Sequence, residues 1–192
     1  HGWLGVMGGS ASGYGSGGGM SVGLSAGNDR WSFITDFRLA GSAFNKPASL
    51  AALICTLGTV DMKTKNDFSF VSVSAGARHH FTTSDVSPFV GMGLALDYMQ
   101  LQDASAATSN YASYSYTGRS SRDYGSNTGL AAYAEAGLDL LRTHTIGGAV
   151  VIRADAPTYS VDTVEVVTSD PTKRQHTSTY APFITAGIAL RF

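Results

Sequence analysis

The sequence predicts an all-β fold: a single domain over residues 1–192 that forms an eight-stranded antiparallel up-and-down transmembrane β-barrel. Three observations lead to this prediction. Apolar residues recur at every second position in several segments of strand length, the period of a strand with two different faces. Charged residues make up only 14% of the chain, whereas about a quarter is typical of soluble domains. The links between the segments alternate in length, as they do in barrels that cross a bilayer.

The expected strands follow one another along the chain, and in each of them one face is apolar and the other is small or polar. The clearest is SPFVGMGLALDYM, in which Val90, Met92 and Leu94 share one face and Gly91 and Gly93 share the other. Each segment has about the 9–11 residues that a tilted strand needs to cross a bilayer. In chain order the segments are GWLGVMGGSA, GMSVGLSAG, RWSFITDFRLAG, FVSVSAGARHHF, SPFVGMGLALDYM, GLAAYAEAGLDLL, TIGGAVVIRADA and YAPFITAGIALRF.

Short and long links alternate between these segments. The short links lie near residues 27–30, 82–87 and 142–145. The long links are expected at about 43–66, 103–128 and 161–178. In bacterial barrels of this kind short turns face the periplasm and long loops face the outside of the cell. Because an even number of strands returns the chain to its starting side, both termini are expected on the periplasmic side.

The polar faces of the expected strands carry charges of both signs in near balance, and no lysine. A face exposed to water would favour long Lys and Glu side chains over glycine. We therefore expect an enclosed lumen in which Arg side chains pair with carboxylates, because unpaired buried charges are costly. The alternative is that several of these residues lie at the rims, in water. The expected lumen network consists of Asp36, Arg38, Arg78, Asp97, Glu135, Asp139, Arg153, Asp155 and Arg191.

Two stretches resemble a known family. Apolar residues alternate up to a terminal phenylalanine at Ile184, Ile188, Leu190 and Phe192. This pattern resembles the C-terminal signal by which the barrel assembly machinery recognises bacterial outer-membrane proteins. The stretch GARHHF, a short polar turn and PFVGMGLALDY resemble the middle hairpin of the small outer-membrane β-barrel superfamily, which contains the OmpA and OmpX barrels.

The resemblance implies a location in the outer membrane of a Gram-negative bacterium. The implied partners are outer-membrane lipids and lipopolysaccharide, with the barrel assembly machinery during biogenesis. The family shares no catalytic residues, so the resemblance assigns no residue a catalytic role.

The long links suggest binding surfaces. Residues 109–127 are rich in Tyr, Ser, Gly and Asn, a composition typical of recognition loops, although a merely hydrophilic loop has the same composition. Residues 48–60 are apolar and need a cover, which the barrel, the outer leaflet or a partner protein would provide. The candidate partner-binding residues are Leu53, Ile54, Cys55, Tyr111, Tyr114 and Tyr116.

Composition narrows the function classes. A net charge of −1 gives no indication of nucleic-acid binding, and a single cysteine, Cys55, gives no internal disulfide and no zinc spacing. We expect no cofactor or metal. His79 and His80 are interpreted as residues of the rim beside a short turn.

The predicted function is that of a non-enzymatic barrel whose loops bind a partner or support envelope integrity. One alternative is an outer-leaflet lipid-modifying enzyme, because His176 precedes Ser178 with the spacing that resembles lipid A deacylases. The other alternative functions are a narrow channel and a soluble ligand-binding barrel.

Overall fold

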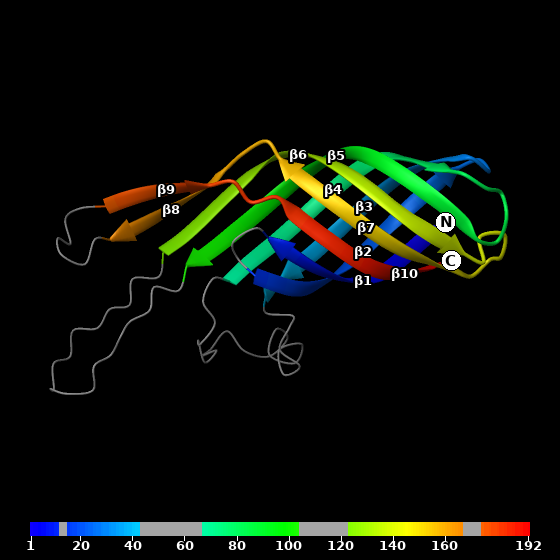
Figure 1. Ribbon diagram of the computed structural model, residues 1–192, viewed down its shortest axis with the longest axis horizontal. Coiled ribbons are helices and arrows are strands. Elements are labelled where there is room, and N and C mark those ends of the chain that lie inside the picture. The colour runs from blue at the N-terminus through cyan, green and yellow to red at the C-terminus, as the bar shows by residue number, and fades with distance from the viewer. Residues whose placement is uncertain (12–14, 43–66, 104–122, 167–173) are drawn as a thin grey trace, which may run out of the picture.

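The computed structural model describes residues 1–11, 15–42, 67–103, 123–166 and 174–192. Within these residues eight strands close into one antiparallel barrel, and two more form a separate two-stranded sheet, so the predicted fold class is confirmed (Figure 1). The barrel strands are β1 (Gly2–Ala11), β2 (Gly15–Gly27), β3 (Trp31–Gly41), β4 (Asp67–His80), β5 (Ser87–Asp103), β6 (Asp123–Leu140), β7 (Gly147–Pro157) and β10 (Phe183–Arg191). The separate sheet pairs β8 (Val161–Val166) with β9 (Arg174–Thr179).

The barrel closes where β1 pairs with β10, a register in which Trp3 lies opposite Arg191 and Ala11 lies opposite Phe183. Closure removes the free edges that an open sheet would expose. Both termini and the short turns lie at one end of the barrel, and the β8–β9 hairpin extends from the other end (Figure 1). Among the described residues, no helix is long and apolar enough to cross a membrane.

The strands carry their apolar side chains on the outside. Leu94 is 63% exposed and Ile188 is 61% exposed, whereas Arg153 is 3% exposed and Glu135 is 6% exposed. Because successive strand residues point to opposite faces, one register fixes the direction of a whole strand. Ionic side chains therefore point toward the barrel axis and aliphatic ones away from it, the reverse of a soluble barrel.

Two strands are longer than the alternation indicates, and one expected long loop contains a hairpin. β5 continues to Asp103 and β6 begins at Asp123, so strand pairing covers part of the loop expected at 103–128. β8 and all of β9 except its last residue, Thr179, lie within the loop expected at 161–178. Strand pairing in these parts is carried by backbone hydrogen bonds and needs no apolar face, so a search for alternating apolar residues does not find it.

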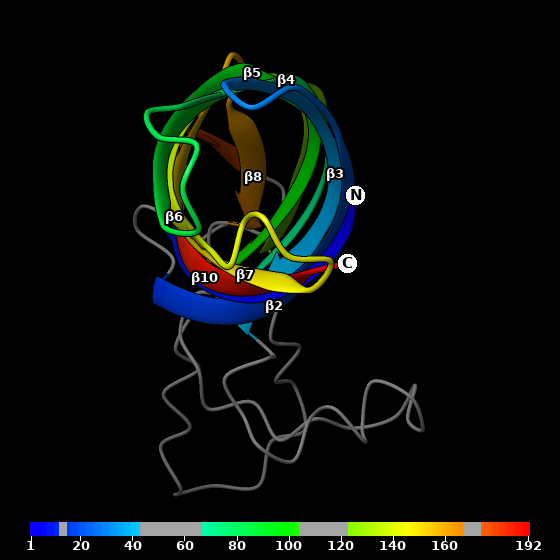
Figure 2. The ribbon, with the colours of Figure 1, turned by 90° about the vertical axis from the view of Figure 1, so that its right-hand side faces the viewer.

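Glycines make room for aromatic side chains inside the barrel. A Cβ atom on Gly9 would lie 2.7 Å from Cζ of Phe183, and one on Gly17 would lie 2.8 Å from Cζ of Phe68. Both contacts are too short for a real side chain, so these two phenylalanines occupy space that only glycine leaves open. Seen along the barrel from the end that carries both termini, β8 is visible through the opening (Figure 2).

Candidate functional site

The interior of the barrel has three zones between the short turns and the long-loop end. At the short-turn end lies a cavity of about 230 Å³, called the mouth cavity here, which is lined in part by Ser32, His80, Asp139, Arg142 and Arg191. In the middle lie the buried charges of the central ion-pair cluster. At the long-loop end lies the apolar plug, which consists of Ala11, Ala40, Phe68, Phe70, Met99, Leu101, Val161, Ala181 and Phe183, with Tyr159 packed against it.

Arg153 is at the centre of the ion-pair cluster. Its Nη2 lies 2.8 Å from Oδ1 of Asp155, and its Nη1 lies 3.4 Å from Oδ2 of Asp36 on the opposite wall. Arg38 donates a hydrogen bond of 2.7 Å from Nη2 to the same Oδ1 of Asp155. Ser74 donates a short hydrogen bond to Asp36. The lumen is thus crossed by contacts that join β3, β4 and β7.

A second buried pair joins Arg78 on β4 to Glu135 on β6. Arg78 donates from Nε to Oε1 at 2.5 Å and from Nη2 to Oε2 at 3.2 Å, the two-pronged geometry that suits a guanidinium and a carboxylate. Cζ of Arg78 also lies 4.5 Å from the ring centroid of Phe89. Cζ of Arg153 lies 3.4 Å from the ring centroid of Tyr133 in the same way. The sequence prediction missed these aromatic partners, whose signal was their position on the inner face.

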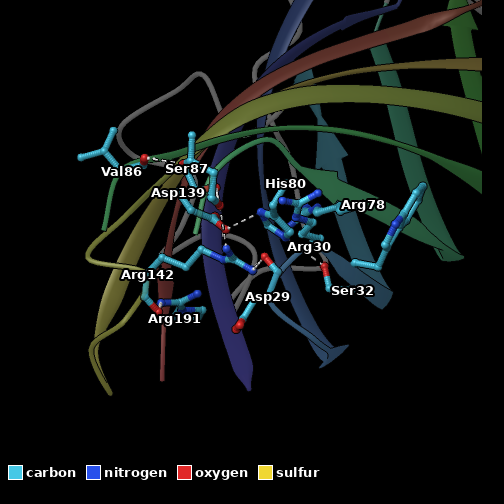
Figure 3. Close-up of polar contacts among 12 residues, drawn as sticks. Asp29, Arg30, Ser32, Arg78, His80, Val86, Ser87, Asp139, Arg142 and Arg191 are labelled. Carbon is cyan, nitrogen blue, oxygen red and sulfur yellow. Dashed lines mark hydrogen bonds and ion pairs between the residues drawn. The ribbon is translucent and has the colours of Figure 1, made fainter. Parts of the chain in front are cut away.

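Three residues of the expected network line the interior but form no pair between an Arg and a carboxylate in the ranges that the structure describes. Asp97 is 1% exposed and lies opposite Ser72 in the register, but no cation within the described part of the chain forms an ion pair with it. Arg191 donates to the backbone carbonyls of Leu141 and Arg142. Asp139 faces His80 in the mouth cavity (Figure 3).

The two adjacent histidines at the end of β4 point in opposite directions. His79 points outward, where its ring centroid lies 4.6 Å from that of Trp31. His80 points inward and is only 4% exposed, so it is buried at the mouth and not solvated at the rim. Its Nε2 lies 3.2 Å from Oγ of Ser32, and its Nδ1 lies 3.5 Å from Oδ2 of Asp139 (Figure 3).

Hydrogen bonds between turns hold the rim of the mouth cavity together. Arg142 donates to the carbonyl of Thr82 at 3.0 Å and to that of Asp29 at 2.6 Å, which joins the three short turns. Thr143 donates a short hydrogen bond to the carboxylate of Asp85. This hydrogen bond holds the pKa of the Asp85 carboxyl below its ordinary value of 3.8.

The residues of the predicted C-terminal assembly signal lie on the outer face of the barrel. Ile184, Ile188, Leu190 and Phe192 all point outward and are more than half exposed.

Ser178 is exposed on β9, and the side chain of His176 lies outside the described residues. No group of described side chains has the ligands for a metal ion. The candidate partner-binding residues, which also lie outside the described part of the chain, are Leu53, Ile54, Cys55, Tyr111, Tyr114 and Tyr116.

No protein-family model matches the chain. No curated protein matches it by sequence.

Several solved structures match over nearly the whole length. Neisserial surface protein A is 16% identical with a TM-score of 0.51, covering 100% of this chain and 97% of that one. Ail, the attachment invasion locus protein of Yersinia pestis, is 13% identical with a TM-score of 0.51, covering 98% and 93%. The outer membrane protein OprG from Pseudomonas aeruginosa is 10% identical with a TM-score of 0.54, covering 100% and 96%. The predicted resemblance to the small outer-membrane β-barrels is therefore confirmed at the level of the fold.

Proposed function

We propose that this chain, a small barrel of the outer-membrane type, spans the bacterial outer membrane and anchors surface loops that bind a partner or support envelope integrity. The observation that carries the proposal is the inverted distribution of side chains. A wall of exposed aliphatic and aromatic residues around a charged interior is stable in lipid and would associate in water. The partners that follow are outer-membrane lipids and lipopolysaccharide, and the barrel assembly machinery during biogenesis.

The filled interior supports an anchor and not a channel. The apolar plug lies at the long-loop end, and the ion-pair cluster places buried side chains that pair with one another in the middle of the lumen. An eight-stranded barrel is just wide enough for side chains to fill it. An ion crossing this lumen would have to displace both zones.

The orientation follows from the lengths of the links. We infer that the short turns and both termini face the periplasm and that the long loops face the outside, as in other barrels of this kind. The proposed assembly signal, Ile184, Ile188, Leu190 and Phe192, runs along β10 to the periplasmic end. The loop residues Leu53, Ile54, Tyr111, Tyr114 and Tyr116 then belong to the surface that a partner would meet.

An epitope tag tests the location and the orientation together. The tag is inserted within 104–122 in one variant and between Thr83 and Ser84 in another, and intact cells are stained before and after permeabilisation. We expect the first tag to be stained on intact cells and the second only after permeabilisation. The reverse pattern would contradict the orientation, and recovery of the protein in the soluble fraction would contradict the membrane location.

The proposed role of the loops has its own experiment. A variant in which Tyr111, Tyr114 and Tyr116 become Ser keeps the barrel intact and removes the aromatic contact area of that loop. We expect this variant to reach the outer membrane at the normal level and to lose co-purification of a surface partner, or to increase the sensitivity of cells to bile salts. Unchanged co-purification and unchanged sensitivity would remove this loop from the proposal.

A further inference from the structure

The mouth cavity brings together a hydroxyl, an imidazole and a carboxylate that the anchoring role does not require. We propose that this cavity is a hydrolytic site for small esters that carry an anionic group, in which Ser32 is the nucleophile, His80 is the general base and Asp139 positions the imidazole. The proposal concerns the end of the barrel opposite to the long loops and does not depend on what those loops bind.

The three groups come from three strands and meet because of the register. Ser32 on β3 lies opposite Arg78, which places it diagonally across from His80 on β4. His80 lies opposite Phe89 on β5, and the two ring centroids are 5.7 Å apart. The imidazole therefore rests against the Phe89 ring and reaches Asp139 on β6, the second strand beyond its own.

The order of the contacts is that of a nucleophile, a base and an orienting acid. Nε2 of His80 faces the Ser32 hydroxyl at 3.2 Å, and Nδ1 faces the Asp139 carboxylate at 3.5 Å. Such distances are often long before a substrate is bound and shorten in the complex. At 3.5 Å the contact between Nδ1 and Oδ2 is within ion-pair distance and is not a hydrogen bond, so Nδ1 has no hydrogen-bond partner among the described residues. His80 is 4% exposed and Asp139 is 6% exposed, so water does not compete strongly for either group.

The cavity also supplies cationic groups and spare donors. Arg142 and Arg191 donate their hydrogen bonds to backbone carbonyls, and neither guanidinium forms an ion pair with a carboxylate among the described residues. Nε1 of Trp3 and Nε of Arg191 are buried N–H groups without a partner in the described part of the chain, and both side chains line the cavity. These groups suit a carboxylate or phosphate on the substrate and the oxyanion that forms during acyl transfer.

The proposed reaction is an ordinary two-step ester hydrolysis. Oγ of Ser32 attacks the carbonyl carbon while Nε2 of His80 takes the hydroxyl proton. The bond between the carbonyl carbon and the leaving oxygen then breaks, and the leaving alcohol receives that proton from Nε2. Water attacks the acyl-Ser32 ester with His80 again as the base, which releases the carboxylic acid and restores Ser32. No oxidant, reductant or metal is needed.

The first experiment is covalent labelling of the full chain, purified in detergent micelles with its fold checked by circular dichroism. A fluorophosphonate probe is added, and the modified residue is located by peptide mass spectrometry. We expect a phosphonate adduct on Ser32 in the wild-type protein and none in Ser32→Ala. Because the adduct is located on the wild-type chain, this measurement holds even if a variant fails to fold. A folded wild-type protein without an adduct on Ser32 would overturn the proposal.

The second experiment compares two aryl acetates, 4-acetoxybenzoate and its neutral methyl ester, by the release of the phenol. His80→Asn is expected to lower kcat for both by at least about 100-fold, the usual contribution of a general base. Asp139→Asn is expected to lower kcat by up to about 10⁴-fold with KM unchanged, because Asp139 acts through the imidazole and does not touch the substrate.

Arg142→Ala and Arg191→Ala are expected to raise KM for the anionic ester alone. Ser84→Ala is the matched control, because the Ser84 hydroxyl donates to the Val86 carbonyl in a turn at the same end of the barrel. We expect it to leave both rates unchanged. Hydrolysis that persists in Ser32→Ala, or that falls equally in Ser84→Ala, would contradict the assignment.

Discussion

The two ends of the barrel interior are built from the same strands but have opposite characters. β4 passes through all three zones and points Phe68 and Phe70 into the apolar plug and Arg78 and His80 toward the short-turn end. The plug is tightly packed, with phenylalanines against glycines, whereas the mouth is a polar cavity. The comparison shows that the apolar plug fills the lumen at the long-loop end. The mouth cavity, at the short-turn end, contains polar groups that are not needed to pack the interior.

The ion-pair cluster separates the two ends, and breaking it is expected to have the largest effect. Arg153→Ala removes one of the two cations that the buried carboxylates of Asp36 and Asp155 share, and only Arg38 remains to pair with them. Removing one partner of a buried pair costs about 3–5 kcal/mol. Urea titration of the protein in lipid vesicles measures the change in the free energy of unfolding. Combining Arg153→Ala with Asp36→Asn is expected to recover part of the lost stability. If Arg153→Ala alone is as stable as the wild type, the ion-pair cluster does not stabilise the barrel.

The plug is expected to respond to cavity formation. Phe183→Ala removes a fully buried ring at the long-loop end and is expected to cost about 3 kcal/mol, because a cavity remains where the ring was. The matched control is Phe33→Ala, which removes an outward-pointing ring whose place lipid can fill, so no cavity remains. Its expected cost in the free energy of unfolding is about 2 kcal/mol. Equal losses in the same urea titration would indicate that the plug is loosely packed. Planar-bilayer conductance of Phe183→Ala is expected to stay at the wild-type level because the ion-pair cluster still fills the lumen.

The rim of the mouth cavity is expected to contribute less. Arg142→Ala removes hydrogen bonds between the short turns and is expected to lower the free energy of unfolding by about 1–2 kcal/mol. Amide hydrogen exchange is expected to rise at residues 82–86 and 141–146 and to stay unchanged in the plug. Arg142→Lys keeps the charge but not the forked donors, so it separates the two contributions. Faster exchange at Phe68 or Phe183 would mean that the two ends are coupled.

Acid is expected to have the smallest effect, confined to the rim. The hydrogen bond from Thr143 lowers the pKa of the Asp85 carboxyl below its ordinary value of 3.8. The contact therefore stabilises the turn at pH values above 3.8. The stabilisation is lost as the pH falls below that value and the carboxyl becomes protonated. Hydrogen exchange of Thr143, compared at pH 6 and at about pH 3 after correction for the intrinsic rate, is expected to show lower protection in acid. Asp85→Asn is expected to show no such dependence, and an identical response in both proteins would exclude Asp85 as the cause.

Much of the wall was predictable from the sequence, and much of the interior was not. Alternation at Val90, Met92 and Leu94 fixes a strand and its two faces, because the bilayer imposes a strict rule on outward residues. The pairing of Arg153 with Asp36 joins residues 117 positions apart and depends on the shear of the barrel, which no local pattern records.

The mouth cavity shows the same limit. The alternation predicts that His79 and His80 point in opposite directions. It does not predict the residues that contact His80, because these come from β3 and β6. Ser32 and Asp139 are ordinary residues in their own segments, and nothing in the sequence near His80 indicates them. The β8–β9 hairpin was missed because strands above the bilayer need no apolar face.

The seam between β1 and β10 has a consequence for biogenesis. These strands come from opposite ends of the described chain, so the sheet stays open until both have been made and brought together. Until then each exposes a row of unsatisfied amides and carbonyls that would join any other extended chain. Until the barrel closes, β1 and β10 are therefore the two margins at which this chain is most prone to pair with another extended chain.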